Sequence, residues 1–476
     1  MKSYAEALAY LYSFANYELS AMSPRTDMRL TRMRRLLELA GNPHERFRSV
    51  HIAGTKGKGS TAAMIASIAQ AAGLRAGLYS TPHLNTHRER MRIDGQLISR
   101  DEFVDRVQRV RRIVDEYDAA FGHPTTYELG TLLTFQYFAD HEVDLAVVEV
   151  GLGGRLDATN VIQPDVAVFA SISYDHTDVL GPTLTDIARE KAGIIKPGVP
   201  AISEPQQPEA AIVLERRARE LGVPLTFVPP LRLIGAHRLI EAGLMPTEIE
   251  QCFELPARPL AAPTVNAEGA GLTQRVRALG RNDPIGAEST EIRIDTGSGA
   301  VVCMRLLGSH QLSNAGVAVA VARQLGWPEQ AIVRGLEEVR WPGRLEILRE
   351  RPLVVADGAH NVDSMEKLAA AIRERFRYER LRVIAGFSAD KDIPGMAAVL
   401  DELANEVVLT RSKHPRSAAP EAITGHFGNV RIARDLGEAL AGQGERELAL
   451  ITGSLYLVGE ARLHLGRVAP EDQDPF

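Results

Sequence analysis

The sequence predicts an α/β protein with two domains, each built around a mainly parallel sheet. The first observation is a series of short apolar runs, each followed by a turn and then by helical spacing. The second is the length of 476 residues, which is more than one hydrophobic core usually accommodates. The third is a second series of the same kind after Trp341-Pro-Gly-Arg344, which we interpret as an interdomain hinge.

The N-terminal series predicts a domain over residues 1–340. Its expected strands are 50–53, 75–80, 144–149 and 165–171, and helical spacing covers 61–72. Residues 229–298 interrupt the pattern, because proline and glycine recur there as in Pro256-Ala-Arg-Pro, and we expect this segment to be irregular and partly inserted. A hairpin is predicted over 290–306 around Thr296-Gly-Ser-Gly299.

The C-terminal series predicts a smaller, doubly wound domain over residues 341–476. Strand-like runs occur at 352–356, 381–385, 406–409 and 448–451, with helical patterns between them. A domain of this length lies within the usual size range.

Composition narrows the class of protein. Hydrophobic residues make up 45% and charged residues 24%, which is typical of globular proteins. No apolar run approaches the roughly eighteen residues of a transmembrane helix, and an acid interrupts the apolar N-terminus, so neither a membrane protein nor a secretory signal is expected. The net charge of −6 weighs against a nucleic-acid partner. We expect a cytoplasmic monomer whose two cysteines, Cys252 and Cys303, are reduced thiols.

A glycine-rich loop between the first strand and the first long helix predicts phosphate binding. Glycines let backbone N–H groups approach phosphate oxygens, the helix N-terminus adds positive potential, a lysine adds a mobile charge, and a terminal hydroxyl can reach Mg²⁺. The spacing departs from G-x-x-x-x-G-K-[ST], because a glycine separates lysine from serine. On these residues alone a purely structural turn stays open. The loop residues are Gly54, Thr55, Lys56, Gly57, Lys58, Gly59 and Ser60.

The loop belongs to a set of motifs that resembles the folylpolyglutamate synthase and dihydrofolate synthase family of ATP-dependent Mur-type ligases. The motifs follow family order from about residue 5 to 465. They are Ser80-Thr-Pro-His-Leu84, Glu89-Arg-Met-Arg-Ile-Asp-Gly95, Thr126-Tyr-Glu-Leu-Gly-Thr131, Glu149-Val-Gly-Leu-Gly-Gly-Arg-Leu-Asp-Ala-Thr-Asn160, Asp175-His-Thr-Asp-Val-Leu-Gly181, Glu190-Lys-Ala-Gly-Ile-Ile-Lys196, Gly308-Ser-His-Gln-Leu-Ser-Asn314, Trp341-Pro-Gly-Arg-Leu-Glu346, Asp357-Gly-Ala-His-Asn361, Gly386-Phe-Ser-Ala-Asp-Lys-Asp392 and Gly453-Ser-Leu-Tyr456.

The resemblance implies a P-loop-containing Mur-ligase-like ATPase domain followed by a Rossmann-like C-terminal domain. It also implies the reaction: ATP phosphorylates a folate or pteroate carboxylate, and the amino group of L-glutamate attacks the acyl phosphate. The core activity expected is addition of glutamate to tetrahydrofolate. Whether dihydropteroate is a second substrate stays open.

The same resemblance implies catalytic and metal-binding residues. Lys58, Glu149, His176 and Lys191 are expected to be catalytic. Two Mg²⁺ ions are expected on Ser60, Thr81, Glu149, His176 and Lys191, the last as a lysine carbamylated by CO₂. Position 81 is usually serine in the family, and threonine keeps the oxygen. From the residues themselves, Glu149 at the end of an apolar strand is placed where ligands usually gather.

Three further residues match family positions that bind ATP: Asn314, Arg344 and Asp357. His360, close to Asp357 in the same motif, is a further candidate for nucleotide contact. A guanidinium suits a triphosphate because it is planar and permanently charged, although a hinge ion pair is the other reading of Arg344. We expect these residues to face the phosphate loop from the second half of the chain, so that domain closure completes the ATP site.

The folate-binding residues implied by the resemblance are Thr125, Thr126, Tyr127 and Glu128, with Leu156, Asp157 and Ala158. Tyr127 stands where phenylalanine is typical, which keeps a ring for stacking but adds a hydroxyl. His83 and Arg90 either meet the anionic substrate or solvate a loop. The glutamate site is expected near Lys391 and residues 412–416.

Three other functions are less consistent with the sequence. A Mur-type ligase for another carboxylate is disfavoured by the folate-type motifs. A nucleotide-gated binding protein without ligation would not need Glu149, His176 and Lys191 together. A dinucleotide oxidoreductase is disfavoured because the loop reads Gly-x-x-Gly-x-Gly and not Gly-x-Gly-x-x-Gly.

Overall fold

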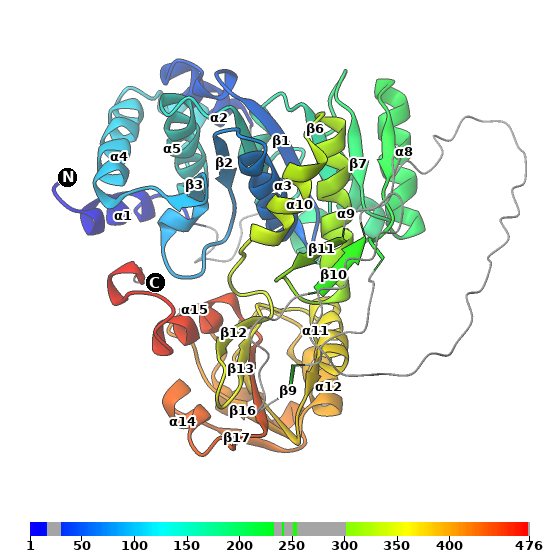
Figure 1. The fold of residues 1–476 in the computed structure, drawn as a ribbon. Helices are drawn as coiled ribbons and strands as arrows, with labels where there is room; N and C mark the ends of the chain where they lie inside the picture. The colour runs from blue at the N-terminus through cyan, green and yellow to red at the C-terminus, as the bar shows by residue number, and fades with distance from the viewer. Residues whose placement is uncertain (17–29, 233–239, 242–250, 255–300, 475–476) are drawn as a thin grey trace, which may run out of the picture.

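The computed structural model describes residues 1–16, 30–232, 240–241, 251–254 and 301–474. Two α/β layers are stacked one above the other in Figure 1, with the N-terminal sheet above and the C-terminal sheet below. The predicted fold class, α/β with mainly parallel sheets, is confirmed.

The N-terminal sheet has eight strands in the order β4-β3-β2-β5-β1-β6-β7-β8. Only the pairs β2–β3 and β3–β4 are antiparallel. The strands are β1 (Arg48–Ala53), β2 (Ala76–Tyr79), β3 (Met91–Ile93), β4 (Gln96–Leu97), β5 (Leu145–Glu149), β6 (Val166–Phe169), β7 (Ala201–Ser203) and β8 (Leu225–Phe227). The four strands expected from apolar runs in this half are therefore present, at β1, β2, β5 and β6.

Helices cover both faces of this sheet, because its central strands are apolar on both sides. Val50 and Ile52 pack beneath α3 (Lys58–Ala71), α9 (Ser309–Gln324) and α10 (Glu329–Glu338). On the opposite face, Val148 packs with α1 (Tyr4–Tyr12), α2 (Leu30–Leu39), α4 (Arg100–Asp115) and α5 (Thr126–Asp140), and Phe169 packs with α7 (Leu184–Ala192) and α8 (Pro208–Leu221). This two-sided burial explains why the strands show no polar–apolar alternation.

The C-terminal sheet has six strands in the order β12-β13-β18-β15-β16-β17, of which only β12 and β13 are antiparallel to each other. The strands are β12 (Glu346–Arg349), β13 (Val354–Ala356), β15 (Arg380–Ala385), β16 (Glu406–Leu409), β17 (Val430–Ile432) and β18 (Glu447–Thr452). One face is covered by α11 (Val362–Arg375) and α12 (Ile393–Leu403), and the other by α14 (Leu436–Leu440) and α15 (Leu455–His464).

Between the two sheets, the chain departs from one expectation. Strand β11 (Val301–Met304) pairs antiparallel with β10 (Gln251–Glu254), and β9 (Ile240–Glu241) pairs with β14 (Phe376–Arg377). The expected hairpin over 290–306 has its first strand and its turn outside the described residues. Its second strand pairs with a segment about fifty residues earlier, a long-range pairing that local turn chemistry does not indicate.

The cysteine prediction is also wrong, because Cys303 is disulfide-bonded in the structure. The backbone register places Cys252 directly opposite Cys303. Residues opposite each other on antiparallel strands have Cα atoms about 4.5–5.5 Å apart, which is within the span of a disulfide. Their wide separation in sequence gave no signal of this pairing.

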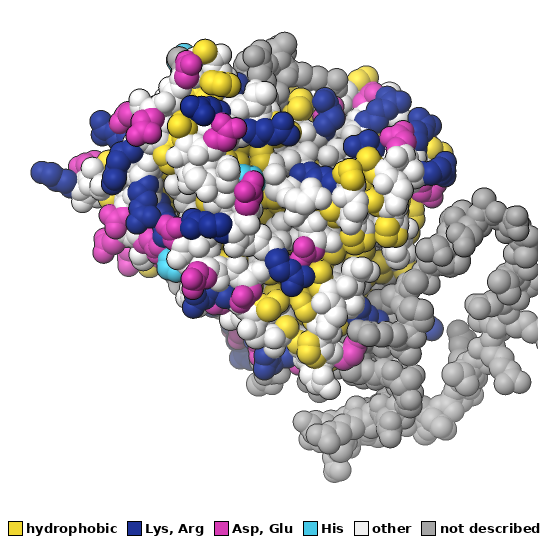
Figure 2. Space-filling view, turned by 90° about the horizontal axis from the view of Figure 1, so that it is seen from above, with side chains coloured by type: hydrophobic (Ala, Val, Ile, Leu, Met, Phe, Trp, Pro, Cys, Tyr) yellow, Lys and Arg dark blue, Asp and Glu magenta, His cyan; other side chains and the backbone are white. Residues whose placement is uncertain are grey.

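Seen from above, the N-terminal half presents basic and acidic side chains interspersed with one another, as Figure 2 shows. Within the described part of the chain, no helix is long and apolar enough to cross a membrane.

Candidate active site at the domain interface

The predicted phosphate loop connects β1 to α3. Gly57 is the N-terminal cap of α3 with a positive φ of +85°, and a Cβ added to it would lie 2.4 Å from Oδ1 of Asn314. The N–H groups of Thr55 and Lys56 donate to the carbonyl of Ser171, at 2.6 and 3.2 Å. The loop is thus fastened to the segment after β6. The first amides of α3 have no acceptor within the helix and suit an anion.

Lys58 faces Glu149 across neighbouring strand ends. The register pairs Ile52 of β1 with Glu149, the last residue of β5, and Nζ of Lys58 lies 3.8 Å from Oε1 of Glu149. The N–H of Thr81 donates to Oε2 of Glu149 at 3.3 Å. Burial raises the pKa of Glu149, and Lys58 opposes that rise. The expected combination of phosphate loop, Lys58, Glu149 and Thr81 is therefore assembled at the carboxyl edge of the sheet.

Lys191 lies directly behind the loop. Its side chain is buried on α7, and its Nζ donates to the carbonyl of Gly54 at 2.8 Å. Burial, reinforced by the positive charge of Lys58, lowers the pKa of Lys191 to about 7. A substantial fraction of this amine is therefore neutral at physiological pH, the form that reacts with CO₂.

Asp175 joins the two halves of the molecule. Its carboxylate accepts from Lys56 of the phosphate loop at 2.9 Å, and from Lys391 at 3.5 Å and Asn361 at 3.3 Å in the C-terminal half. Although burial opposes ionisation, the neighbouring lysines and His176 hold the pKa of Asp175 well below its usual range. The carboxylate is thus charged and bound to cations of both halves.

His176 lies beside Asp175 at the mouth of this region. Its side chain is 48% exposed, and Nε2 lies 3.8 Å from Oδ1 of Asp175. Partial burial and nearby lysines lower its pKa, so the ring is neutral and has a nitrogen available as a ligand.

The residues expected to hold Mg²⁺ offer one carboxylate, one imidazole and two hydroxyls. Among the residues that the structure describes, no three His, Cys, Asp or Glu side chains converge as a metal cluster. Mg²⁺ is commonly bound through one or two carboxylates together with substrate phosphates. The donor set therefore fits Mg²⁺ that shares oxygens of a bound nucleotide, and does not form an all-protein cage.

The C-terminal half contributes Arg344, Asp357 and His360. Oδ2 of Asp357 accepts from the N–H of Leu345 at 3.0 Å, which fixes the residue after Arg344. Burial raises the pKa of Asp357, and Arg344 opposes that rise. Nε2 of His360 lies 3.2 Å from Nζ of Lys56, and the charge of Lys56 lowers the pKa of His360 well below its ordinary value. Of the three, His360 meets the phosphate loop at Lys56 and the charge of Arg344 acts on Glu149, whereas Asp357 accepts from backbone N–H groups of its own half.

Asn314 was expected on that opposite side, and this expectation is wrong. It lies on α9, which packs with α3 in the same N-terminal core. Its amide oxygen accepts from Thr61 at 3.1 Å, and its amide nitrogen donates to Gln311 at 2.9 Å. Small residues along α9 allow it to pack closely on α3, so Asn314 supports the loop from within its own layer.

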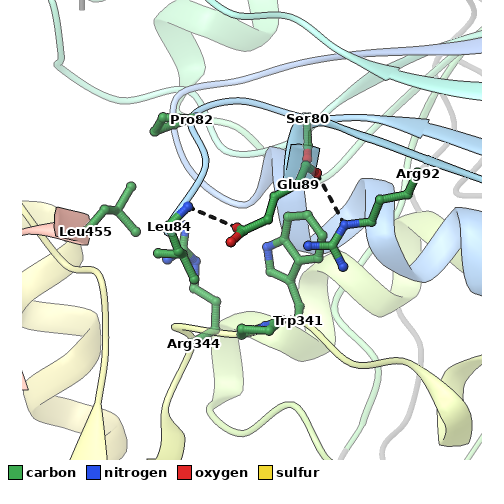
Figure 3. Close-up of a pocket in the computed structure, with 9 residues that line it drawn as sticks. Ser80, Pro82, Leu84, Glu89, Arg92, Trp341, Arg344 and Leu455 are labelled. Atoms are coloured by element: carbon green, nitrogen blue, oxygen red, sulfur yellow. Dashed lines mark hydrogen bonds between the residues drawn. The ribbon is translucent and has the colours of Figure 1, made fainter. Parts of the chain in front are cut away.

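A small cavity lies between the two halves, next to the phosphate loop. Figure 3 shows that it is lined by the loop after β2, the hinge and the start of α15. In it, Trp341 lies so close to the loop that a Cβ on Gly59 would be 3.1 Å from its ring, and Arg92 stacks on the indole at 5.4 Å. The lining residues are Ser80, Pro82, Leu84, Glu89, Arg92, Trp341, Pro342, Arg344 and Leu455.

The residues expected to bind folate lie at the start of α5 and after β5, but most of their polar groups have protein partners. Thr125 and Glu128 form the capping box of α5, and Thr126 donates to the carbonyl of Leu11 at 2.9 Å. Glu128 is also paired with buried Arg32 at 2.9 Å. Thus three of these four side chains stabilise the local fold.

The other folate candidates form a buried hydrogen-bonded chain. Oδ1 of Asp157 accepts from Tyr127 at 3.1 Å and from the N–H of Thr159 at 2.9 Å, and Thr159 lies 2.8 Å from Nε2 of His51. The Tyr127 ring is half-buried and stacks on Tyr79 with centroids 6.3 Å apart. Leu156 is half-buried and Ala158 is buried beside them.

His83 and Arg90 do not solvate a loop. Both are buried, and Nε of Arg90 donates to Nδ1 of His83 at 2.9 Å. Burial lowers the pKa of His83 well below its usual value, and Arg90 adds to this effect. In the C-terminal half, the loops that carry Lys391 and residues 412–416 lie together, since the N–H of Ala389 donates to the carbonyl of Arg416.

Sequence reasoning did not single out Asp175, Asn361 and Trp341 as site residues. Each lies inside a quoted motif, next to a residue that was assigned. An acid at the end of a buried strand and a tryptophan at a hinge were the available signals. Their roles depend on contacts between segments more than a hundred residues apart, such as Asp175 with Asn361 and Gly59 with Trp341, which a linear pattern does not reveal.

Comparison with protein families identifies two matching regions. Residues 52–203 match the Mur ligase middle domain, and residues 343–455 match the Mur ligase glutamate ligase domain. The first region contains the phosphate loop, Glu149, His176 and Lys191, and the second contains Arg344, Asp357 and His360.

Two curated relatives match this chain along almost their entire length. A dihydrofolate synthase/folylpolyglutamate synthase of Bacillus subtilis is 32% identical over 92% of this chain and 94% of its own length. A folylpolyglutamate synthase of Lacticaseibacillus casei is 33% identical, covering 97% of this chain and 98% of its own.

Solved structures show the same relationship in three dimensions. A Mycobacterium tuberculosis folylpolyglutamate synthase complexed with ADP and AMPPCP superposes with a TM-score of 0.77 at 31% identity, covering 93% of this chain and 96% of that one. An FPGS–AMPPCP–folate complex has a TM-score of 0.74 at 31% identity, covering 97% of this chain and 99% of that one.

Proposed function

The chain belongs to the folylpolyglutamate synthase/dihydrofolate synthase family of Mur ligases, and on this premise we propose that it joins L-glutamate to a reduced folate in an ADP-forming reaction. It is an acid–amino-acid ligase that uses ATP. The core substrate that we propose is tetrahydrofolate, with dihydropteroate as the candidate second substrate.

One observation supports the proposal above the others. The phosphate loop meets a buried acid of its own sheet and polar groups of the second half at one place: Lys58 lies 3.8 Å from Glu149, and Lys56 lies 3.2 Å from His360. A reaction that requires ATP, a carboxylate and an amine to meet away from water needs such a junction.

The first step forms an acyl phosphate. An oxygen of the folate carboxylate attacks the γ-phosphorus of ATP, the bond to the β–γ bridging oxygen breaks, and ADP leaves. We assign Lys58 and the amides at the start of α3 to the phosphates, because they concentrate positive charge where negative charge is transferred. Arg344 approaches from the other half as a planar, permanently charged donor.

The second step forms the amide. The amino group of glutamate attacks the acyl carbon, phosphate leaves, and the nitrogen loses a proton. We place the glutamate near Lys391 and residues 412–416, within a C-terminal domain over 341–476 that also closes the ATP site. Lys391 already binds the carboxylate of Asp175 at 3.5 Å, which supports its suitability for a carboxylate substrate. A Lys391→Ala variant should raise the KM for glutamate while leaving the affinity for ADP unchanged.

Ser60, Thr81, Glu149 and His176 are the residues that we expect to hold two Mg²⁺ ions shared with the nucleotide, together with Lys191. Bound Mg²⁺ would spread the charge of the transferred phosphoryl group. For Lys191 to join them it must carry a carbamate, because a protonated amine is not a ligand. Its pKa of about 7 supports that modification. Protein equilibrated with ¹³C-labelled bicarbonate should show a carbamate carbon resonance that is missing in Lys191→Arg; no resonance in the wild-type protein would contradict the assignment.

The deciding experiment offers ATP, Mg²⁺ and labelled glutamate with dihydropteroate and with tetrahydrofolate in separate reactions. Amide product from tetrahydrofolate supports the core activity, and product from dihydropteroate establishes the second. Absence of product from both would overturn the proposal and favour a Mur-type ligase of another carboxylate. ATP binding without ADP release on any carboxylate would favour a nucleotide-gated binding protein.

We propose further that the enzyme works as a monomer in the cytoplasm, on small molecules only. Light scattering of the purified protein should give one mass of 51.9 kDa across the concentrations used for assays. A mass of twice that value would contradict this part.

A further inference from the structure

The segment after α15 folds back onto the N-terminal half. Oδ2 of Asp474 accepts from the N–H of His87 at 2.6 Å and from the hydroxyl of Tyr4 at 2.8 Å. The N–H of Asp474 donates to the carbonyl of Asn85 at 2.8 Å, and the hydroxyl of Thr86 lies 3.3 Å from Oδ1. The Asp474 side chain is buried by these contacts. Figure 1 shows this red end of the chain on the side of α1.

Two neighbouring residues extend the contact. Asn85 donates to the side chain of Gln473 at 2.7 Å. Asp472 pairs with Arg88, and with Arg100 at 3.3 Å. We call residues 472–474 the C-terminal clasp. It provides acceptors for a loop, residues 85–90, that is rich in arginine yet largely buried.

The clasped loop continues into the wall of the interdomain cavity. Leu84, just before it, packs against the hinge, where a Cβ on Gly343 would lie 3.0 Å from its side chain. Glu89 accepts from the N–H of Leu84 at 3.0 Å, and the carbonyl of Glu89 accepts from Arg92, as Figure 3 shows. Arg92 in turn stacks on Trp341. The loop therefore reaches both the hinge and the ring that covers Gly59.

Without the clasp, this loop would lose its fixed position. The N–H of His87 and the carbonyl of Asn85 belong to residues that are almost fully buried, and buried backbone groups need partners. Arg88 would also lose the carboxylate of Asp472, with which it pairs. These groups would then bind water, and this requires the loop to leave its buried position and become mobile.

We propose that Asp474 is a positioning residue of the active site: it holds loop 85–90, and through Leu84 and Arg92 it sets the wall of the cavity beside the phosphate loop. No contact of Asp474 with substrate is involved. The clasp also ties the N-terminal sheet to the C-terminal half at a point far from the hinge in sequence. The inference places the clasp next to the site whose function is proposed above, but its structural part does not depend on that function.

The test compares three full-length variants with the wild-type protein. Asp474→Ala removes the acceptor. Asp474→Asn keeps an oxygen for His87 and Tyr4, and its amide can donate to the hydroxyl of Thr86, so it should restore the contact. Glu471→Ala is the matched control, because Glu471 is an exposed acid three residues earlier.

The first readout is limited trypsin digestion, which cleaves after arginine. We measure cleavage after Arg88, Arg90 and Arg92 relative to cleavage after Arg382, which is buried in β15 and becomes accessible when the protein unfolds globally. The ratio should rise about tenfold in Asp474→Ala, because local opening exposes the loop, and stay within about threefold in the other two variants. Normalisation separates loop opening from global unfolding, which raises cleavage at all sites.

The second readout is the dissociation constant for ADP, measured calorimetrically. Asp474→Ala should weaken ADP binding about threefold or more, while Asp474→Asn and Glu471→Ala match the wild-type protein. An unchanged trypsin ratio in Asp474→Ala, or equal changes in Asp474→Ala and Glu471→Ala, would overturn the inference. A wild-type protein that binds no ADP would instead overturn the proposed function, and the trypsin ratio would still decide the clasp.

Discussion

The nucleotide end and the expected folate end of the site are built differently. At the nucleotide end, polar side chains from both halves of the chain point at one another across an interface, as Lys56 does toward Asp175 and His360. At the folate end, Thr126 and Glu128 make hydrogen bonds or ion pairs within one layer of the fold. The first region concentrates charged groups that pair with one another across the interface, and the second holds neutral hydrogen bonds and one ion pair inside a single layer.

Because of this difference, a match to a family motif indicates ligand binding at the nucleotide end but can reflect fold stability alone at the folate end. Four lysines and one arginine near one phosphate loop exceed the two carboxylates, Glu149 and Asp175, that they face, and a triphosphate would balance the remaining positive charge. A capped helix start and a buried ion pair have a sufficient reason in stability alone. The folate-end motif therefore separates into residues that stabilise the fold and Tyr127, whose half-buried ring is the remaining candidate for contact with a substrate.

Breaking the folate end should have the largest effect on stability. Glu128→Ala removes the carboxylate that pairs with buried Arg32 and half of the capping box of α5. Loss of one partner of a buried pair typically costs about 3–5 kcal/mol of unfolding free energy. Chemical denaturation should show this loss, whereas Glu38→Ala, which breaks an exposed pair, should change stability by at most about 0.5 kcal/mol. A stable Glu128→Ala protein with a raised KM for folate would show direct substrate binding instead.

Breaking the nucleotide end should affect turnover and leave the fold intact. Lys58→Ala removes a half-buried cation at the first turn of α3. Removal of one group that stabilises transferred charge typically lowers kcat by about 10²–10³-fold. Steady-state ligase assays should show this loss, and circular dichroism should show an unchanged fold. Lys2→Ala, at an exposed lysine, is the control, and retained activity in Lys58→Ala would remove the loop from the mechanism.

The sequence predicted the strands well where burial on both faces leaves a simple signature, as at β1, β5 and β15. It also brought together the loop and Glu149, because the ends of parallel strands meet at one edge, whereas Lys191 on α7 was indicated only by the family resemblance. The sequence did not predict features that depend on contacts between distant segments. The pairing of β10 with β11, the placement of Asn314 beside Thr61, and the clasp by Asp474 depend on segments about fifty to almost four hundred residues apart. No local period encodes such contacts.

Variants of two glycines distinguish the cost of backbone strain from the cost of a steric clash. Gly57 lies in the phosphate loop, and Gly73 lies after the other end of α3. Gly57 and Gly73 have nearly equal positive φ angles, +85° and +87°, but a Cβ at Gly57 would lie 2.4 Å from Asn314 whereas one at Gly73 has nothing within 4 Å. Gly73→Ala should cost about 1–2 kcal/mol of unfolding free energy from strain alone. Gly57→Ala should cost about 1–3 kcal/mol more from the clash. Calorimetry with ADP should show weakened binding only for Gly57→Ala; equal behaviour of both variants would mean that Asn314 moves aside freely.

His51 connects the two regions, and it gives the smallest expected effect. It lies on β1, three residues before the phosphate loop, and its Nε2 contacts Thr159 in the chain that ends at Tyr127. Burial lowers the pKa of His51 to about 3, whereas a histidine in the unfolded chain has a pKa of about 6.5.

The sign of the pH effect follows from these two values. Below pH of about 6.5 the unfolded chain binds a proton that the folded protein excludes, so the stability contributed by neutral His51 falls as pH drops from about 6.5 toward 3, by at most about 1.4 kcal/mol per pH unit. Urea unfolding between pH 7 and pH 5 should therefore show a steeper loss for the wild-type protein than for His51→Asn, which has no titrating group at this position. His51→Asn should be the less stable protein at pH 7, because its shorter side chain loses the contact with Thr159 and leaves space in a fully buried site. Parallel pH profiles for the two proteins would mean that His51 takes up its proton without unfolding, and that the hydrogen-bonded chain between the two regions tolerates charge.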